Sequence, residues 1–274
     1  MEKVLNLYKP RGETPLQTLE KFQTAHPEYT AEKMTYAGRL DPMAEGVLLA
    51  LVGEETKNRE VYTDLPKEYV FEFILGLETD TYDLLGLPKA PKVANVFFEN
   101  SPRSDGSSNS SKNTFATSSL IKDYIENKNG KFSQKYPPFS SKVVGGKSLF
   151  SLAKAGRIFE KDLPSHEVEI FSAEYLGERN LDKKILEDFI RETVSSVDGD
   201  FRQKQIMTDW KKVFSESERE TYVIHKARIS VSSGFYVRQF VRDIGEHFKT
   251  GAVTFAIART RVGKYAIKDS VRVG

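Results

Sequence analysis

The sequence predicts an α+β fold in which helices flank a large, mainly antiparallel mixed sheet. Segments with strand-like alternation and segments with helical spacing follow one another along the chain. They do so without the regular strand–helix–strand repeat of a parallel α/β protein, which favours an α+β arrangement. The 274 residues can bury a large core. Because no internal repeat is evident, we predict one domain that spans residues 1–274.

Strands dominate the first half of the predicted fold. The segments expected to form them are Val4–Tyr8, Gly46–Gly53 and Lys67–Leu75. The first ends at a turn signal, and the second is continuously apolar, as in a buried strand. A helix is predicted between these two strands, beginning at Thr14 or Pro15 and ending near Pro27. Its apolar face should consist of Leu16, Leu19 and Phe22.

Helices and strands alternate irregularly in the second half. Helical spacing is found in residues 120–126, 147–155, 181–194 and 235–248. Alternation predicts strands over residues 166–175, 222–232 and 253–258. Ahead of them, residues 101–119 consist mainly of Ser and Asn and offer almost nothing to bury. This segment is therefore predicted to be a mobile loop.

The composition restricts the chemistry available to the protein. The chain has 41 Lys+Arg against 39 Asp+Glu, so its net charge of +2 does not by itself identify a nucleic-acid partner. It contains no cysteine, which excludes a disulfide framework, a thiolate zinc site and a cysteine nucleophile. The four histidines are scattered without metal-ligand spacing, so neither a metal nor another cofactor is expected.

The sequence carries no sign of a membrane protein. No apolar run approaches the roughly 20 residues that would span a bilayer, and the first residues lack the apolar stretch of a signal peptide. We therefore expect a cytoplasmic protein without a membrane partner, acting as a monomer.

The most informative segment for chemistry is the loop that precedes the second predicted strand. Asp41 lies in it between a glycine turn at Gly38 and Pro42, immediately before the apolar run. This setting should hold the backbone and aim the carboxylate from a loop edge, as a catalytic group requires. An Asp-Pro pair is also common in structural turns, and turn chemistry alone favours that second interpretation.

The segment around Asp41 is one of five sequence motifs. It consists of Gly38-Arg39-Leu40-Asp41-Pro42-Met43-Ala44-Glu45-Gly46-Val47-Leu48. The other four lie within residues 9–12, 67–81, 137–147 and 233–245. Together they resemble the TruB pseudouridine synthases, whose signature G-x-L-D-P-x-A-x-G-x-L contains the catalytic aspartate. Because all five occur in family order over nearly the whole chain, they are far more specific than a single motif.

The resemblance implies roles for three residues. Asp41 aligns with the catalytic aspartate, Tyr69 with the active-site tyrosine, and Arg238 with the arginine that pairs with the aspartate. Isomerisation of uridine breaks the N-glycosidic bond and rejoins the base through C5, so a carboxylate is needed as nucleophile or base. The sequence leaves open whether Asp41 attacks the sugar or removes a sugar proton. Arg238 would keep the carboxylate ionised and oriented, and Tyr69 would stack on the base and position a proton transfer.

Binding of the RNA should involve further residues around this site. The target base must be extruded from folded RNA, because its reacting atoms are shielded in the stack. We expect aromatic or apolar walls for the flipped base and cations for its phosphates. The residues expected to contact RNA are Tyr36, Lys9, Arg11, Arg39, Lys57, Asp80, Lys142 and Lys147. Outside the family pattern, Tyr69 would be an ordinary strand aromatic, and the cations would be ordinary solvated surface residues.

The chain departs from the family pattern in three places. Tyr36 stands where bacterial members typically carry a histidine. The tyrosine ring retains the ability to stack but loses the hydrogen bonding of an imidazole. The connection over residues 177–221 is longer than usual and predicts an insertion, which is either an RNA-contacting element or a neutral surface elaboration. The small C-terminal RNA-binding domain of the PUA type, found in many relatives, is expected to be absent.

The resemblance implies isomerisation of a uridine in tRNA, at uridine 55 of the TΨC stem-loop. Two other hypotheses stay open. The first is a non-catalytic tRNA-binding protein or chaperone, against which the intact Asp41, Tyr69 and Arg238 argue. The second is a pseudouridine synthase that acts on another RNA, including the guide-dependent type, which the missing PUA-type domain makes less attractive.

Overall fold

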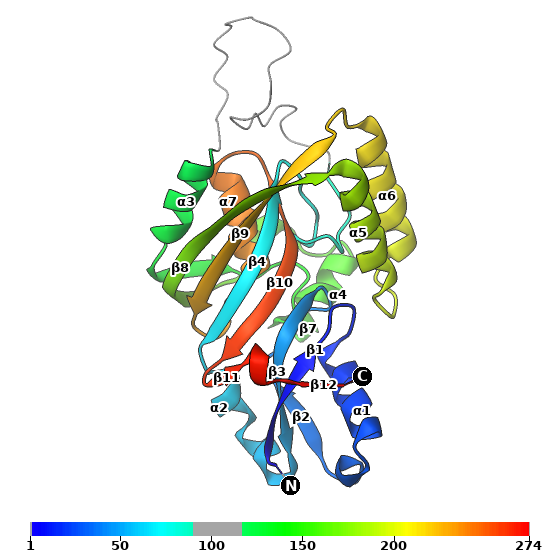
Figure 1. Ribbon diagram of the computed structural model, residues 1–274, viewed down its shortest axis with the longest axis vertical. Helices are drawn as coiled ribbons and strands as arrows, with labels where there is room; N and C mark the ends of the chain where they lie inside the picture. Colours follow the sequence, from blue (N-terminus) through cyan, green and yellow to red (C-terminus); the bar gives the residue numbers. More distant parts are fainter. Residues whose placement is uncertain (1, 90–116, 274) are drawn as a thin grey trace, which may run out of the picture.

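The computed structural model describes residues 2–89 and 117–273, and one long mixed sheet runs through its centre (Figure 1). The strands are β1 (Val4–Lys9), β2 (Met34–Ala37), β3 (Ala44–Val52), β4 (Lys67–Leu75), β5 (Gly130–Lys135), β6 (Val143–Val144), β7 (Lys147–Ser148), β8 (Ser165–Asp182), β9 (Thr221–Val231), β10 (Ala252–Val262), β11 (Tyr265–Ala266) and β12 (Val271–Arg272). Within the described residues, the sheet order is β12-β1-β3-β10-β4-β9-β8-β5. β2 joins the sheet beside β3, β11 joins it beside β10, and β6 pairs only with β7.

The sheet is mainly antiparallel, as predicted. Parallel pairing occurs between β1 and β12 and between β3 and β10. The other neighbours in the described sheet pair antiparallel. Helices lie on both faces: α1 (Pro15–Ala25), α2 (Arg59–Thr63), α3 (Ser118–Glu126), α4 (Leu149–Lys154), α5 (Lys183–Ser195), α6 (Gln203–Glu216) and α7 (Val237–His247). The predicted α+β class with a large mixed sheet is confirmed.

The core around β4 shows why the alternation in this strand predicted its two faces. Tyr69, Phe71 and Phe73 lie on one face, in a cluster with residues of α3 and α7. Ile74 points to the other face, where it packs in a cluster with residues of α5 and α6. Side chains that are two apart in a strand share a face, so the sheet separates two helical layers at this point.

The N-terminal strands are covered by smaller helices. α1 starts with a capping box, in which the Thr14 hydroxyl accepts from the Gln17 N–H and the Gln17 side chain accepts from the Thr14 N–H. Its predicted apolar face is partly wrong, because Leu16 is 53% exposed while Leu19 and Phe22 are buried. Thr18 takes a buried place on this face, and its hydroxyl donates to the side chain of Glu13.

The segment predicted to be an insertion, residues 177–221, lies partly within the sheet. β8 continues to Asp182, which pairs with Thr221 at the start of β9. The segment between these two paired ends is the helical hairpin α5–α6, residues 183–220, and α6 was not predicted. Trp210 and Phe214 of α6 are 2% exposed, so the hairpin contributes to the core.

Several predicted boundaries shift by a few residues. Of the predicted loop over residues 101–119, positions 101–116 lie outside the described residues. The last positions of that segment belong to α3, which begins at Ser118 and is capped by the Thr117 hydroxyl. The helix predicted over residues 147–155 is shorter, because β7 takes its first two positions. The helix predicted from residue 235 begins at Val237.

Candidate active site

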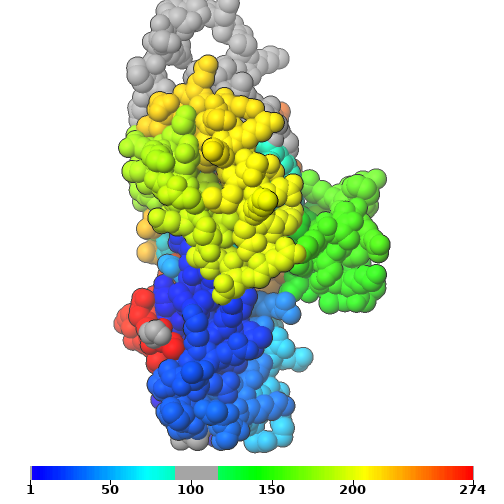
Figure 2. All heavy atoms as spheres, turned by 90° about the vertical axis from the view of Figure 1, so that its right-hand side faces the viewer, coloured from blue at the N-terminus to red at the C-terminus, as the bar shows by residue number. Residues whose placement is uncertain are grey.

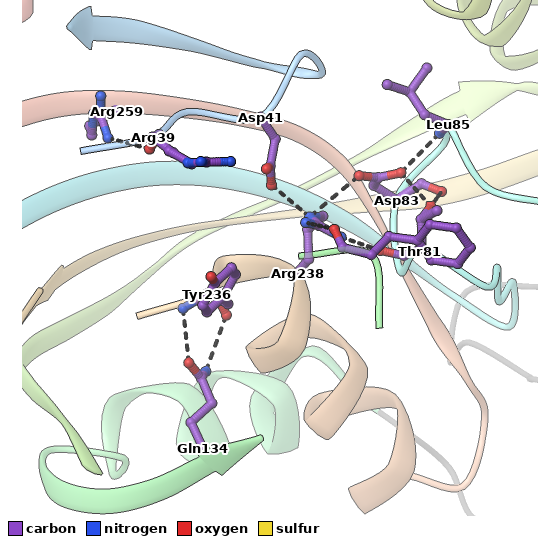
Figure 3. Close-up of polar contacts among 10 residues, drawn as sticks. Arg39, Asp41, Thr81, Asp83, Leu85, Gln134, Tyr236, Arg238 and Arg259 are labelled. Carbon is purple, nitrogen blue, oxygen red and sulfur yellow. Dashed lines mark hydrogen bonds and ion pairs between the residues drawn. The ribbon is translucent and has the colours of Figure 1, made fainter. Parts of the chain in front are cut away.

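Asp41 lies on the loop that joins β2 to β3, and its carboxylate points toward Arg238 (Figure 3). The loop starts at Gly38 with a φ of +73°, which glycine adopts without strain. Leu40 and Met43, which flank Asp41 and Pro42 in the sequence, are buried, and the Ala44 N–H donates to the Asp41 carbonyl over 2.9 Å. The backbone is therefore held in place, while 40% of the Asp41 side chain stays exposed.

Arg259 of β10 holds the other side of this loop. Its Nε donates to the Val47 carbonyl over 2.7 Å, and Nη1 donates to the Arg39 carbonyl over 2.9 Å. Nη2 reaches the Gly38 carbonyl at 3.4 Å. Arg259 is only 1% exposed, so its buried guanidinium holds the loop backbone through these hydrogen bonds. Arg259 was not among the predicted site residues.

Arg238 joins the Asp41 loop to the C-terminal part of the chain. It lies in the first turn of α7 and is 3% exposed. Its Nε donates to Asp41 Oδ2 over 2.8 Å, Nη1 donates to the Thr81 carbonyl over 2.6 Å, and Nη2 donates to the Phe139 carbonyl over 3.3 Å. Asp83 Oδ2 lies 3.5 Å from Nε (Figure 3). The pairing of Asp41 with Arg238 implied by the resemblance is thus present in the geometry.

The charge of Arg238 is stabilised although the side chain is buried. Burial acts to lower the pKa of the guanidinium, but the carboxylates of Asp41 and Asp83 outweigh it and raise that pKa. The helix dipole does not favour a cation in the first turn of α7. Two carboxylates and two backbone carbonyls compensate for this placement.

Asp83 is the buried carboxylate of this cluster, and it was not among the predicted site residues. Its side chain accepts from the Thr81 hydroxyl over 2.6 Å and from the Leu85 N–H over 3.0 Å. Burial raises the pKa of Asp83 to about 6, in spite of the opposing effect of Arg238. Asp80 of the same loop was predicted instead. In the structure, Asp80 forms an ion pair with Arg202.

Two tyrosines border the loop that carries Asp41. Tyr69 of β4 is 8% exposed and shares a core cluster with Leu40. Tyr236 precedes α7, and Gln134 holds its backbone through two hydrogen bonds of 2.8 and 3.1 Å (Figure 3). Burial raises the pKa of the Tyr236 hydroxyl, and the negative charge of Asp41 adds to this effect. Tyr236 belongs to a motif quoted in the sequence analysis, but no role was assigned to it.

Four of the residues expected to contact RNA have accessible side chains. Arg39 is exposed and lies two positions from Asp41. Lys142 and Lys147 are exposed on the β6–β7 hairpin, and Lys142 Nζ lies 5.0 Å from the centre of the Tyr136 ring. Tyr36 of β2 is partly exposed.

Lys9 is fully buried, so the expected phosphate contact through this residue is not supported. Its Nζ donates to the carbonyls of Pro10 and Glu13 over 2.8 and 2.7 Å. Burial lowers the pKa of Lys9 to about 7, although Asp41 and Glu13 act in the opposite direction. The ammonium instead stabilises the turn after β1.

Three other residues expected to contact RNA have protein partners. The guanidinium of Arg11 lies 4.9 Å from the centre of the Phe189 ring. Lys57 follows β3 and forms an ion pair with Glu54. β3 has nine residues and spans roughly 25–30 Å, and it separates the Asp41 loop at its start from the segment after its end that carries Lys57. Asp80 is held by Arg202, so the structure does not bring these residues together in one RNA-facing group.

Two general expectations concern metals and membranes. Within residues 2–89 and 117–273, no group of three or more His, Asp or Glu side chains is arranged to hold a metal ion. No helix in the same described residues combines the length and apolar character needed to cross a bilayer.

Solved structures share this arrangement of the chain. A Cbf5–Nop10–Gar1 complex superposes with a TM-score of 0.54 and 17% identity, covering 98% of this chain and 52% of that one. An H/ACA ribonucleoprotein bound to a substrate RNA that contains 2′-deoxyuridine gives a TM-score of 0.51 and 16% identity, covering 99% of this chain and 51% of that one. At these identities the likeness establishes the fold alone.

The sequence comparison then specifies the family. Residues 27–195 match the family described as TruB family pseudouridylate synthase (N terminal domain), and the chain belongs to this family. Relatives named tRNA pseudouridine synthase B include proteins of Thermosipho melanesiensis, 27% identical over 267 residues, and Aquifex aeolicus, 25% identical over 271 residues. The alignments cover 97% and 99% of this chain, and the chain spans 66% and 72% of these relatives' lengths.

Proposed function

We propose that this chain isomerises uridine to pseudouridine in tRNA, at uridine 55 of the TΨC stem-loop. The observation that carries the proposal is the ion pair between the partly exposed Asp41 carboxylate and the buried Arg238. Membership of the TruB family and relatives named tRNA pseudouridine synthase B support the reaction and the RNA class.

The geometry of Asp41 suits the first step of this reaction. Arg238 bonds to Oδ2, and within the described part of the chain Oδ1 accepts no hydrogen bond. A carboxylate with one oriented and one available oxygen is suited either to attack C1′ of the ribose or to remove a proton from the sugar. In both routes the base detaches, turns and rejoins the ribose through C5. Before the reaction starts, the arrangement of Asp41 and Arg238 is the same for both routes.

Aromatic and cationic side chains provide the proposed RNA surface. Tyr69 would contact the flipped base, although the residue is only 8% exposed before RNA binds. The Tyr236 ring lies edge-on to Tyr136, with 5.7 Å between their centres, and Lys142 Nζ lies 5.0 Å from the centre of the Tyr136 ring. Arg39 stands at the Asp41 loop. This sequence of rings and cations leads from Asp41 toward the β6–β7 hairpin and would bind bases and phosphates.

The test compares the wild-type chain with Asp41→Asn on unmodified tRNA. We expect pseudouridine at position 55 with the wild type and none above background with Asp41→Asn, because the amide keeps the shape of the side chain but loses its nucleophilic and basic character. The dissociation constant for tRNA should stay within about threefold, since Asp41 contributes no favourable charge to phosphate binding.

The outcomes separate the parts of the proposal. Modification at another uridine would overturn the target and retain the reaction. Tight binding of tRNA by a wild-type chain that makes no pseudouridine would favour a non-catalytic binding protein. Turnover by Asp41→Asn at the wild-type rate would remove Asp41 from the mechanism.

A further inference from the structure

The α5–α6 hairpin is an addition to a pair of strands that need no long connection. Asp182 at the end of β8 pairs directly with Thr221 at the start of β9, so a tight turn would join them. The hairpin is nevertheless anchored on the sheet. Trp210 is 2% exposed, and its Nε1 donates to the Leu84 carbonyl over 3.3 Å. The loop between the two helices is therefore presented in a defined position.

Arg202 ends this loop and makes two specific contacts outside the hairpin. Its guanidinium forms a two-pronged contact with Asp80, with Nη1 at 2.6 Å from Oδ2 and Nη2 at 3.3 Å from Oδ1. The same guanidinium lies 4.7 Å from the centre of the Phe139 ring. A planar guanidinium combines both contacts, whereas a lysine ammonium would provide neither the fork nor the stacking surface.

Both contacts lie next to groups that hold Arg238. Asp80 precedes Thr81, whose carbonyl accepts from Arg238 Nη1 over 2.6 Å. Phe139 accepts from Arg238 Nη2 through its own carbonyl over 3.3 Å. Arg202 therefore contacts the residue that precedes Thr81 and the side chain of Phe139. The carbonyls of Thr81 and Phe139 are two of the groups that orient Arg238, the partner of Asp41.

The backbone of Arg202 supports a specific role for this position. Its φ is +65°, a left-handed conformation that costs a non-glycine residue about 1 kcal/mol or more. Neighbouring loop residues also contact the segment after the β6–β7 hairpin. Asp200 pairs with Lys154 of α4 at 2.7 Å, and the Phe201 ring lies 6.3 Å from that of Phe150. Figure 2 shows the yellow hairpin stacked above the blue N-terminal part, beside the projecting green segment that contains α4.

We propose that Arg202 is a positioning residue for the active site. It holds the Asp80–Thr81 turn and Phe139 in one geometry, and these groups in turn hold Arg238 against Asp41. The α5–α6 hairpin then contributes to catalysis by positioning active-site residues, without contact to the reacting atoms. This inference rests on the proposed function, because its effect is on the rate of pseudouridine formation.

The test replaces Arg202 by glycine, which suits a φ of +65° and removes the guanidinium without adding backbone strain. We expect the single-turnover rate on tRNA to fall by about 10- to 100-fold, since a small displacement of a catalytic group has effects of this size. The dissociation constant for tRNA should change by less than about twofold, because Arg202 is already paired with Asp80. Arg202→Lys should recover only a small part of the rate, because it keeps the charge and loses the fork.

Lys249→Gly is the matched control. Lys249 is also a non-glycine cation with positive φ, at +55°, but it is exposed at the far end of α7. This variant should keep the wild-type rate. A second measurement uses Asp80→Asn alone and combined with Arg202→Gly. If the two residues act through one contact, the rate loss of the double variant should be clearly smaller than the product of the two single losses.

The results discriminate between this role and others. A weaker tRNA affinity with an unchanged rate would make Arg202 an RNA contact and overturn the inference. A lower melting temperature with an unchanged rate would make it a purely structural residue and also overturn it. A wild-type chain that forms no pseudouridine contradicts the proposed function, whereas an active wild type with a fully active Arg202→Gly contradicts only the inference.

Discussion

Arg238 is shared by two carboxylates in different environments. Asp83 is buried and bonded to Thr81 and Leu85, so its position is determined by the protein. Asp41 contacts the same guanidinium but keeps 40% of its side chain exposed. One carboxylate therefore orients the arginine, and the other remains available to a substrate. Pairs of acidic groups whose surroundings differ in this way commonly divide structural and chemical work.

Burial of Asp83 should make the stability of the protein depend on pH. Its folded-state pKa of about 6 exceeds the ordinary value of 3.8, so the folded state binds this proton more tightly than the unfolded state. The stabilisation from protonated Asp83 is fully present below about pH 4 and is lost as the pH rises through about 6. In Asp83→Asn this loss is absent. The unfolding free energy of the variant minus that of the wild type should therefore increase with pH, on the order of 2–3 kcal/mol between pH 4 and 7.

Urea unfolding at several pH values between 4 and 7.5 measures this difference. Asp269→Asn, at an exposed position in the segment before β12, is the control and should show no such trend. A difference between Asp83→Asn and the wild type that stays constant over this range would show that Asp83 keeps its charge throughout.

At the scale of elements, periodicity identified those whose apolar residues face one core. β4 alternates strictly over Tyr69, Phe71 and Phe73, and it was predicted with its full bounds. β5 was missed because Gln134 is its only buried residue, so its sequence carries no apolar alternation. α6 could have been found, since Ile206, Trp210 and Phe214 recur at a spacing of four and all three are buried.

The contacts in the site were predictable only where a motif carried them. The resemblance pointed to the pair of Asp41 and Arg238, which the structure brings to 2.8 Å. Lys9 and Asp80 were expected to face RNA because a sequence does not show which polar side chains are buried or paired. The same limit applies to Arg259, whose buried guanidinium bonds to carbonyls that are more than 200 positions away in sequence. Roles that depend on tertiary burial therefore needed the structure.

The parallel pair of β3 and β10 requires a glycine beside the Asp41 loop. Gly46 has a φ of +112°, and a Cβ there would lie 2.3 Å from the Arg259 carbonyl oxygen. Because this neighbour is backbone, it cannot turn aside as a flexible side chain can. Gly46→Ala should lower the free energy of unfolding by roughly 3 kcal/mol or more, as overpacking and left-handed strain add. Urea denaturation followed by circular dichroism measures this loss.

Gly130→Ala separates the two causes. Gly130 has a similar φ of +107°, but nothing lies within 4 Å of a Cβ built on it. Its loss should be only about 1–2 kcal/mol, from backbone strain alone. Equal losses for the two variants would mean that the close approach of β3 and β10 contributes nothing to the requirement for glycine.

At the scale of the whole molecule, the proposed site lies where the N-terminal strands meet the larger part of the sheet. The Asp41 loop leads into β3, and β10 pairs in parallel with β3 (Figure 1). Helix α7, which follows β9 in the chain, supplies Arg238. The α5–α6 hairpin spans the same junction. Arg11 stacks on Phe189 of α5, and Gln17 of α1 donates to Asp198 over 3.1 Å. Contacts from both sides thus hold the junction that carries Asp41.

The small net charge of +2 implies that attraction of RNA depends on local cations. The exposed Lys142 and Lys147, at and beside the β6–β7 hairpin, are the strongest candidates, since Lys142 contacts the Tyr136 ring, which in turn contacts Tyr236. We predict that Lys142→Ala combined with Lys147→Ala weakens tRNA binding and leaves the single-turnover rate at saturating enzyme within about twofold. The slope of log Kd against log salt should decrease by about 2, because each phosphate contact contributes about 1. Titrations at four salt concentrations give this slope.

Lys184→Ala combined with Lys212→Ala removes the same charge from the outer surface of α5–α6 and should leave the slope unchanged. If both double variants lower the slope equally, attraction comes from the overall charge and not from the β6–β7 hairpin.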